Sequence, residues 1–387
     1  GLFRGQNISV DTFQFAQEYA KIGSPLTVLV PSGNPNDYTY TWKVDTYAVW
    51  GNSSNTYTPT KSDVEKWISV EIKDSTGAVA DTLKMYCSLL PVIYIDTEGG
   101  EAITTKEYYI NADMRIQGSD LYNSGNTTLY NGKTEIKGRG NTTWEYGLKK
   151  PYKLKLDTKT DLFGMGKNKH WVLIANYFDR SLMRDKIAYD LSAAIGAEVA
   201  MESTWVDLIL NGEYVGNYRL TEHIRVSPDR VNVYNWEDTA EDAAKAICKA
   251  EGLSKDQRDM LEDQMTEDLA WITSDQVTFN GITYNVSDYF EYPECTGGYL
   301  LNIDAHEKDS PFTFGTPRGT TIQFNKPEYA YTNKTIWTNV RKELYAFESA
   351  VFSPTHYASL NGEQVHYSEL FDMDSLLRYW LLCEYTN

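Results

Sequence analysis

Short stretches of largely apolar residues, separated by turn sequences, recur through the first quarter of the chain. Between residues 23 and 90 these stretches are LTVLV, YTYTWKV, TYAVW, KWISVEIK and VADTLKMYCSL, and the sequences SGNPND, GNSSN and DSTG separate some of them. Several strands at a spacing of roughly 8–12 residues with such turns are typical of a small two-sheet sandwich. The pattern therefore predicts an all-β domain over residues 1–90.

The predicted sandwich is of immunoglobulin-like type, and Trp42 is its expected core residue. Strands rich in Ser, Thr and Tyr also occur in carbohydrate-binding sandwiches, where exposed Trp and Tyr side chains form a platform for sugars. The sequence does not assign the faces of the strands. A spacer role and a binding role therefore both stay open.

A second domain is expected to begin near Pro91, where VIYIDT is typical of a new strand. Further strands are predicted at YYINADMRIQ, KTEIKG and WVLIAN, and a helix follows Ser181 because apolar residues there recur on one helical face. Asn211-Gly212 separates TWVDLIL from EYVGNYRLTEHI, and Asn-Gly supplies the positive φ angles of a tight hairpin turn. The domain is thus predicted to combine a sheet with a crossing helix.

Two acidic helices are predicted within residues 237–272, with Thr239 and Ser254 as their N-caps and Gly252 between them. Two more helices, at roughly residues 334–351 and 373–385, are expected to end the chain. The predicted fold class is therefore α+β over residues 91–387, preceded by the small all-β sandwich.

The formal net charge of −18 over 387 residues excludes some partners. Duplex nucleic acid and anionic membranes would be repelled, so neither is expected as the main partner. No apolar run approaches the roughly 18 residues that a membrane span needs. The four cysteines (Cys87, Cys248, Cys295 and Cys383) lie far apart without a CxxC motif, so the sequence predicts no zinc site and assigns no disulfide.

One stretch, from Lys137 to Asp157, reverses this negative charge locally. It holds five lysines and Arg139, which stands between two glycines. Glycines let the backbone approach a ligand closely, Asn141 can donate hydrogen bonds, and an arginine fork suits phosphate oxygens. The stretch therefore predicts a phosphate-binding loop and strand, although a solvated basic strand beside an ordinary turn would have the same composition.

The usual catalytic motifs are absent from the sequence. It contains no HExxH, no GxSxG and no GxGxxG after a strand, and no two of its five histidines are at metal-ligand spacing. Metal-dependent hydrolysis and triad chemistry are therefore not expected.

Several segments nevertheless resemble the spore-coat-protein-H (CotH) kinase family, in order and in spacing. They are GRGNTTW, KKPYKLKLD, LFGMGKNKHWVLIANYFDRSLMRDKIAYDL, LILNGEYVGNYRLTEHIR, DRVNV and GGYLLNID. The resemblance runs from about Pro91 to the end of the chain. It implies an atypical protein-kinase-like fold, with residues 237–272 as a helical insert and the sandwich as an accessory domain of the kind found on secreted bacterial members.

The resemblance also implies an activity, which is the phosphorylation of Ser or Thr on a secreted or surface protein with ATP and Mg²⁺. Lys155 is the expected ATP-binding lysine because YKLK matches the family's pattern, and Lys150 and Lys153 are the alternatives. Such a cation is needed because the phosphate charge must be neutralised for in-line transfer. Arg139 and Asn141 are expected to lie over the phosphates.

Two further positions follow from the resemblance. Glu222, in LTEHI, is expected near the adenine or ribose, although a buried structural carboxylate would fit the sequence equally well. The helix after Ser181 carries Arg184 and Asp185 where a kinase is expected to place a Glu that pairs with the lysine. The usual ion pair between helix and lysine is therefore not predicted.

The family's catalytic Asp and its Trp-Asp metal-binding motif are expected beyond Asn387, so no catalytic or metal-binding residue is assigned. On this basis we expect the chain to be truncated and inactive as it stands. The alternative is a non-catalytic surface or scaffold protein that binds polysaccharide or a protein partner through the sandwich and its tyrosine-rich strands.

Overall fold

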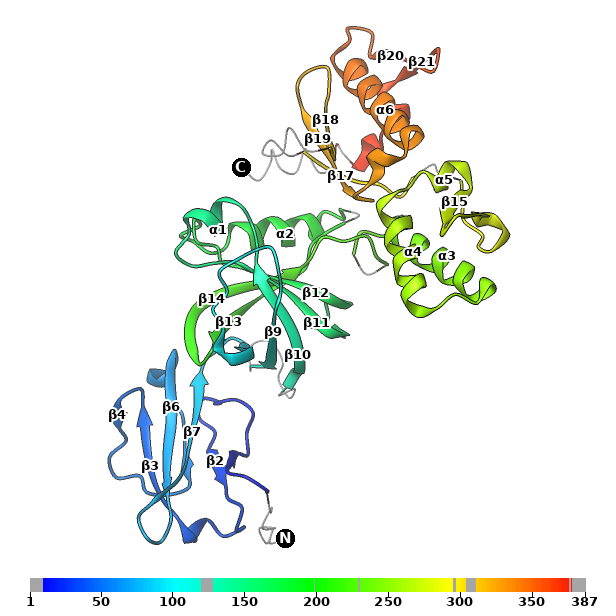
Figure 1. Ribbon diagram of the computed structural model, residues 1–387. Helices are drawn as coiled ribbons and strands as arrows, with labels where there is room; N and C mark the ends of the chain where they lie inside the picture. The colour runs from blue at the N-terminus through cyan, green and yellow to red at the C-terminus, as the bar shows by residue number, and fades with distance from the viewer. Residues whose placement is uncertain are drawn as a thin grey trace, which may run out of the picture. The chain divides into compact units, whose positions relative to one another are not determined.

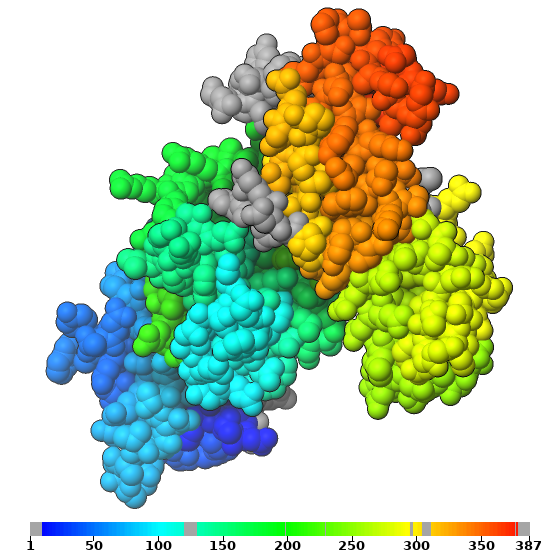
Figure 2. All heavy atoms as spheres, turned by 45° about the horizontal axis from the view of Figure 1, so that its top comes forward, coloured from blue at the N-terminus to red at the C-terminus, as the bar shows by residue number. Residues whose placement is uncertain are grey.

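The computed structural model describes residues 10–119, 128–197, 199–228, 230–294, 297–303, 311–375 and 377. These residues form two compact units. The first unit comprises Gly1–Leu191 and Met201–His223, and the second comprises Ser192–Ala200 and Ile224–Asn387. The elements of each unit can be followed in Figure 1 and their surfaces in Figure 2. The architecture is α+β, as predicted.

The first unit begins with two antiparallel sheets, drawn in blue in Figure 1. One sheet has the order β1 (Gln14–Phe15), β2 (Leu26–Leu29), β5 (Thr56–Tyr57), and the other has the order β4 (Tyr47–Ala48), β3 (Thr39–Val44), β6 (Lys66–Lys73), β7 (Val79–Cys87). The short 3₁₀ turns Pro35–Asp37 and Lys61–Asp63 connect strands. The N-terminal region is thus all-β, which agrees with the prediction, and its immunoglobulin-like topology stays a prediction.

Trp42 lies at the centre of the core that the two sheets share. Its side chain is fully buried, and its indole N–H donates to the Ser54 carbonyl oxygen at 2.8 Å. The rings of Tyr57 and Phe15, from the opposite sheet, stack on it at centroid distances of 5.6 and 6.2 Å. A buried aromatic side chain with its polar atom satisfied is a strong source of stability, so Trp42 is the core residue that the sequence predicted.

The rest of the first unit is a closed barrel of seven strands. Its order is β10 (Thr128–Gly138), β11 (Tyr152–Asp161), β12 (Lys167–Ile174), β14 (Glu213–Glu222), β13 (Ser203–Leu210), β8 (Val92–Thr97), β9 (Ile110–Gln117). The pairing of β13 with β8 is parallel and every other pairing is antiparallel. Closure satisfies the strand edges that an open sheet would leave exposed.

Alternation along each strand decides which side chains enter the barrel. In β11, Tyr152, Leu154 and Leu156 are buried inside, and Lys153 and Lys155 therefore point outward. The hairpin between β13 and β14 turns through Asn211 and Gly212, which have φ angles of 50° and 79° as the Asn-Gly signal predicted. The barrel thus carries a packed apolar interior and a polar outer face.

Two helices accompany the barrel. The short α1 (Thr142–Tyr146) follows β10, and α2 (Arg184–Ala194) follows β12. None of the α2 residues is fully buried. A 3₁₀ turn, Glu98–Gly100, follows β8.

The second unit mixes helices with small sheets. Its helices are α3 (Trp236–Glu251), α4 (Lys255–Glu267), α5 (Trp271–Ser274), α6 (Lys334–Phe352) and α7 (Tyr367–Leu370). The sheets are β15 (Gln276–Phe279) with β16 (Ile282–Asn285), β17 (Leu300–Ile303) with β19 (Thr321–Lys326) and β18 (Thr313–Gly315), and β20 (Tyr357–Leu360) with β21 (Glu363–His366). The 3₁₀ turns Val286–Asp288 and Ala330–Thr332 join them.

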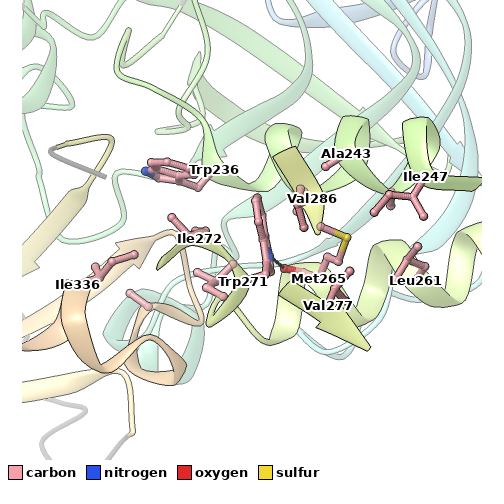
Figure 3. Close-up of a cluster of buried hydrophobic side chains, with 14 of the residues drawn as sticks. Trp236, Ala243, Ile247, Leu261, Met265, Trp271, Ile272, Val277, Val286 and Ile336 are labelled. Carbon is pink, nitrogen blue, oxygen red and sulfur yellow. Dashed lines mark hydrogen bonds between the residues drawn. The ribbon is translucent and has the colours of Figure 1, made fainter. Parts of the chain in front are cut away.

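The acidic helices α3 and α4 contribute their apolar faces to the core of this unit. Figure 3 shows side chains from α3, α4 and α5 meeting those of β15 and of Ile336 on α6. Within this cluster the Trp271 indole N–H donates to the Met265 carbonyl oxygen at 2.8 Å. Residues 237–272 are therefore part of the packed core and not only a surface feature.

The predicted N-cap of α3 is wrong, whereas that of α4 is confirmed. Asn235 caps α3 by accepting hydrogen bonds from the Glu237 and Asp238 N–H groups, four residues before Thr239. The helix starts early because Trp236, in its first turn, is buried in the core. Ser254 caps α4 with Gln257 in a reciprocal capping box.

Some sequence-based expectations fall partly outside the described residues. The predicted terminal helix is described only at residues 373–375 and 377, and Cys295 and Cys383 are not described. Cys87 and Cys248 are buried free thiols. Within the described ranges, no helix is long and apolar enough to cross a bilayer.

Candidate functional site

Lys155 lies on the outer face of the barrel, where an acid already neutralises it. Its ammonium group is 2.7 Å from a carboxylate oxygen of Glu135, the residue directly opposite on β10. The ring of Tyr109 lies 5.8 Å away. Both charged side chains are more than one third exposed, so this is a surface ion pair that a competing anion can open at low cost.

The same pair borders a hollow of about 700 Å³ on the outer face of β8 to β11. Its lining holds five carboxylates and two lysines, namely Asp96, Glu98, Asp113, Glu135, Asp157, Lys133 and Lys155. Lys133 pairs with Asp113 at 2.8 Å, much as Lys155 pairs with Glu135. The hollow is therefore acidic, and a bare polyphosphate would be repelled from most of it.

Arg139 lies beyond the end of β10, in a loop with an unusually tight local fit. A Cβ on Gly138 would lie 2.3 Å from the Trp144 ring, and Gly140 has a φ angle of 82°. The backbone N–H of Arg139 donates to the Pro151 carbonyl oxygen at 3.2 Å. The two glycines thus allow Trp144 to pack and the loop to turn, which fixes the backbone from which Arg139 projects.

The guanidinium group of Arg139 is a cation without an acidic partner in the part of the chain that the structure describes. Burial lowers its pKa, and the nearby Tyr189 side chain of α2 partly offsets this. A desolvated cation gains much from an anion with which it can form two parallel hydrogen bonds. Arg139 is therefore the predicted site residue whose surroundings best suit a phosphate.

Two of the predicted residues, Lys150 and Asn141, lie next to the short helix α1. Lys150 donates from its ammonium group to the Trp144 carbonyl oxygen and lies 5.5 Å from the Trp144 ring centre. Asn141 is exposed and directly precedes α1, and its side chain does not cap the helix. Lys150 therefore fixes the loop that carries Arg139, and the Asn141 amide projects into solvent.

Lys153 occupies the outer face between these two regions. It stands opposite Lys137 on β10 and opposite Val172 on β12. The Lys137 ammonium group lies 4.7 Å from the Tyr109 ring centre. Lys153 thus continues the cationic strip along β11 from Lys155 toward Arg139.

Glu222 ends β14 as a buried carboxylate. It accepts a hydrogen bond from the Glu202 backbone N–H at 2.7 Å, just before β13 begins. It therefore closes the β13–β14 ladder, which is the structural alternative that the sequence left open.

The six predicted residues do not line one pocket. Of the six, only Lys155 borders the acidic hollow, whereas Arg139 lies toward α2. The register pairs Glu135 with Lys155 and Gly138 with Tyr152. Arg139 is therefore four residues from the level of Lys155, which at about 3.3 Å per residue is roughly 13 Å along the strands. The two long side chains and a polyphosphate between them could span this separation.

Arg219, a fully buried side chain on the outer face of β14, was not predicted from the sequence. One of its guanidinium nitrogens lies 2.8 Å from a carboxylate oxygen of Asp185 on α2, and the Tyr189 ring lies 4.4 Å from the guanidinium carbon. A helix–sheet ion pair therefore does form, but its cation comes from β14 and not from β11. Alternation in β14 could have revealed this residue, because Tyr218 and Leu220 on either side of it point into the barrel.

Arg219 is incompletely satisfied. Its Nε and Nη1 atoms are buried and have no hydrogen-bond partner in the described structure. Buried donors without partners cost free energy, and those of a guanidinium cost more than neutral ones. The barrel face beside α2 therefore carries two arginines, Arg139 and Arg219, whose guanidinium groups could both donate hydrogen bonds to an anion.

No described residue can be assigned to a metal ion. Among the described residues, no group of three or more His, Cys, Asp or Glu side chains has the arrangement of a metal site. Arg139 and Arg219 have the chemistry to hold the phosphates of a nucleotide, and no described residue is assigned to Mg²⁺.

The fold and the site together define an α+β protein with a closed barrel whose outer face, beside α2, carries two incompletely paired arginines, Arg139 and Arg219. A family described as CotH kinase protein matches residues 136–387, well over half of the chain. The chain belongs to the CotH kinase protein family. No curated protein matched it.

The family match begins inside β10, whereas the resemblance in the sequence was expected from about Pro91. Strands β8 and β9 precede the match but belong to the same barrel. Ile93, Ile95, Ile110 and Ile116 pack in one core with residues of β11 to β14. The folded unit therefore extends further toward the N-terminus than the match.

Proposed function

We propose that this chain binds Mg-ATP on the outer face of its barrel, as part of a CotH-type atypical kinase that phosphorylates Ser or Thr on a protein. Membership of the CotH kinase protein family supports nucleotide and metal use in general terms. The kinase-like fold of residues 91–387, with a helical insert at 237–272, is part of the proposal. So is a secreted or surface location in a bacterium, with an immunoglobulin-like accessory domain at residues 1–90.

The observation that carries the proposal is the environment of Arg139. Its guanidinium group is desolvated enough to lower its pKa, and no carboxylate in the described structure pairs with it. A phosphate would supply the missing negative charge and accept two parallel hydrogen bonds. The CotH match includes this loop, since it begins at residue 136.

The remaining predicted residues take graded roles in the proposal. Lys153 and Lys155 continue the cationic strip along β11, and Lys155 becomes available once its exposed pairing with Glu135 opens. Lys150 holds the loop, Asn141 offers an exposed amide, and Glu222 lies at the end of β14. Bound Mg-ATP would supply the transferable phosphoryl group and, through its metal, part of the charge neutralisation.

The test is thermal denaturation of the protein with and without millimolar Mg-ATP. Binding confined to the folded state raises the midpoint, since ligand at about 100 times its dissociation constant adds about 2.7 kcal/mol to the free energy of unfolding. Arg139→Gln is expected to lose most of this shift. Arg115→Gln is the matched control, because Arg115 is another barrel arginine but stacks on Tyr94 at 4.2 Å.

The same assay distinguishes the candidate lysines. Lys155→Ala is compared with Lys133→Ala, since both lysines border the acidic hollow and both pair with a carboxylate. If Lys155 binds phosphate, only its loss reduces the shift, and Lys153→Ala tests the alternative. No shift in the unmodified protein, or an equal shift in Arg139→Gln, would overturn the proposal.

A second candidate function rests on the sandwich. Tyr47, on β4, and Trp50, just after it, are 80% and 93% exposed. Exposed aromatic rings suit stacking against sugars, which supports a non-catalytic surface or scaffold protein that binds polysaccharide or a protein partner. Retention on insoluble polysaccharide that Trp50→Ala abolishes and Tyr108→Ala preserves, without any nucleotide shift, would favour this role. Tyr108 is an exposed aromatic residue before β9.

A further inference from the structure

Arg219, on β14, and Arg139, in the loop after β10, both lie near one side chain of α2. Tyr189 stacks on the Arg219 guanidinium group and also influences the pKa of Arg139. The register explains why the two arginines lie close together. Arg139, just after β10, is hydrogen-bonded to Pro151, just before β11. One position beyond the Tyr152–Leu173 pair, Pro151 is level with Ile174 on β12, which pairs with Arg219 on β14. Three strand spacings of about 4.8 Å place the two backbones roughly 14 Å apart, so long side chains can converge between them.

Asp185 is the only acid that the described structure places against this arginine pair. It accepts one hydrogen bond from Arg219 and is 49% exposed. Two further nitrogens of Arg219 stay unsatisfied. The pairing therefore leaves Arg219 short of partners, whereas Asp185 would regain full hydration on release.

We infer that Arg219 is a second ligand for the phosphoryl group bound at Arg139, and that Asp185 competes with that group for Arg219. The inference rests on the proposed nucleotide site and adds an arginine and an internal competitor to it. A phosphoryl group has enough acceptor oxygens to satisfy both guanidinium groups at once. Because Arg219 is fully buried, the group reaches it only when α2 shifts on the barrel.

Such a shift is physically accessible because α2 is lightly attached. None of its residues is fully buried, and Ile187 is more than half exposed. Moving the helix therefore sacrifices little apolar burial. Occupancy of the arginine pair and the position of α2 are thus coupled, and Asp185 is the switch between the two states.

The decisive variant is Asp185→Asn in the full chain. Loss of the competing charge is expected to raise the affinity for Mg-ATP by about tenfold in titration calorimetry, which lies within the usual range of coupling between sites. Asp190→Asn is the matched control, since Asp190 lies on the same helix but pairs with Lys186. A purely structural ion pair predicts the opposite sign, because its loss would loosen α2 without freeing a ligand.

Arg219→Lys tests the second ligand without removing the buried charge. Lysine cannot form the bidentate fork, so the affinity for Mg-ATP is expected to fall by about tenfold or more. Inorganic pyrophosphate is the parallel probe. If Asp185→Asn raises the affinity for both Mg-ATP and pyrophosphate, the site recognises the phosphoryl group itself. If it raises the affinity for Mg-ATP alone, recognition also requires the rest of the nucleotide.

The outcomes separate this inference from the proposed function. Unchanged affinity in Asp185→Asn and Arg219→Lys, with a loss in Arg139→Gln, would overturn the inference and leave the nucleotide site standing. Absence of Mg-ATP binding in every form, the unmodified protein included, would overturn the proposed function. Lower affinity in Asp185→Asn would also overturn the inference.

Discussion

At the scale of single residues, neighbours decide which cation can serve as a site. Lys155 and Arg139 both belong to the basic stretch, yet Glu135 neutralises the lysine at 2.7 Å and no described carboxylate meets the arginine. The sequence could predict that both side chains are cationic. It could not predict their partners, because these depend on the register between β10 and β11.

Gly138 gives a prediction at the same scale. Substitution with Ala would place a Cβ 2.3 Å from the Trp144 ring, so the ring must move and the Arg139 loop with it. Gly138→Ala is expected to lower the free energy of unfolding by about 1–3 kcal/mol in urea denaturation, the usual cost of overpacking. No loss of stability would show that the Trp144 ring moves aside without strain, and would contradict this prediction.

The control for this substitution is Gly315→Ala. Gly315 is also a strand glycine, but a Cβ there would meet nothing within 4 Å. A change within about 0.5 kcal/mol is expected, as for most unconstrained surface positions. Equal losses in both variants would show that Gly138 is needed for a reason other than the contact with Trp144.

At the scale of elements, local patterns predicted the strands and hairpins well. The segment KWISVEIK corresponds to β6 (Lys66–Lys73), and Asn211-Gly212 forms the predicted hairpin turn. These predictions of strands and turns were confirmed because the alternation of apolar residues and the conformational preferences of turn residues depend on only a few neighbouring residues. The start of α3 and the pairing of Asp185 with Arg219 were not predicted, since burial of Trp236 and the packing of α2 depend on distant parts of the chain.

The junction between the sandwich and the barrel contains a buried acid, Asp207 on β13. Its carboxylate accepts hydrogen bonds from the Ser88 hydroxyl at 2.5 Å and the Tyr214 hydroxyl at 3.1 Å. Burial nevertheless raises its pKa above the ordinary value of 3.8, because it outweighs these hydrogen bonds. The folded protein therefore holds a proton at Asp207 more tightly than the unfolded chain does.

This shift predicts a pH dependence with a definite sign. A raised pKa favours the folded state below the ordinary carboxyl pKa, and the benefit is lost as the pH rises through the folded value. The unfolding free energy of the unmodified protein is expected to fall relative to Asp207→Asn as the pH increases upward from about 4. Urea titrations across this range measure it, with the exposed Asp96→Asn as control. A constant difference between the two proteins would contradict the assignment.

At the scale of the whole molecule, the family match and the fold define different boundaries. The match covers residues 136–387, whereas the barrel needs β8 and β9 from residue 92 onward to close. Sequence segments indicated the family through their order, but they could not show that the basic stretch lies on the outside of a closed barrel. Closure depends on the pairing of β8 with β13, more than 100 residues away along the chain.

The central claim is that the basic strip formed by Arg139, Lys153 and Lys155 binds the phosphates of a nucleotide. Hydrogen–deuterium exchange with and without saturating Mg-ATP tests it most directly, because it reports which backbone segments the ligand orders. The account predicts slower exchange in peptides covering residues 138–155, and no change in sandwich peptides covering residues 66–87. Unchanged exchange at 138–155, or protection confined to the sandwich, would contradict it.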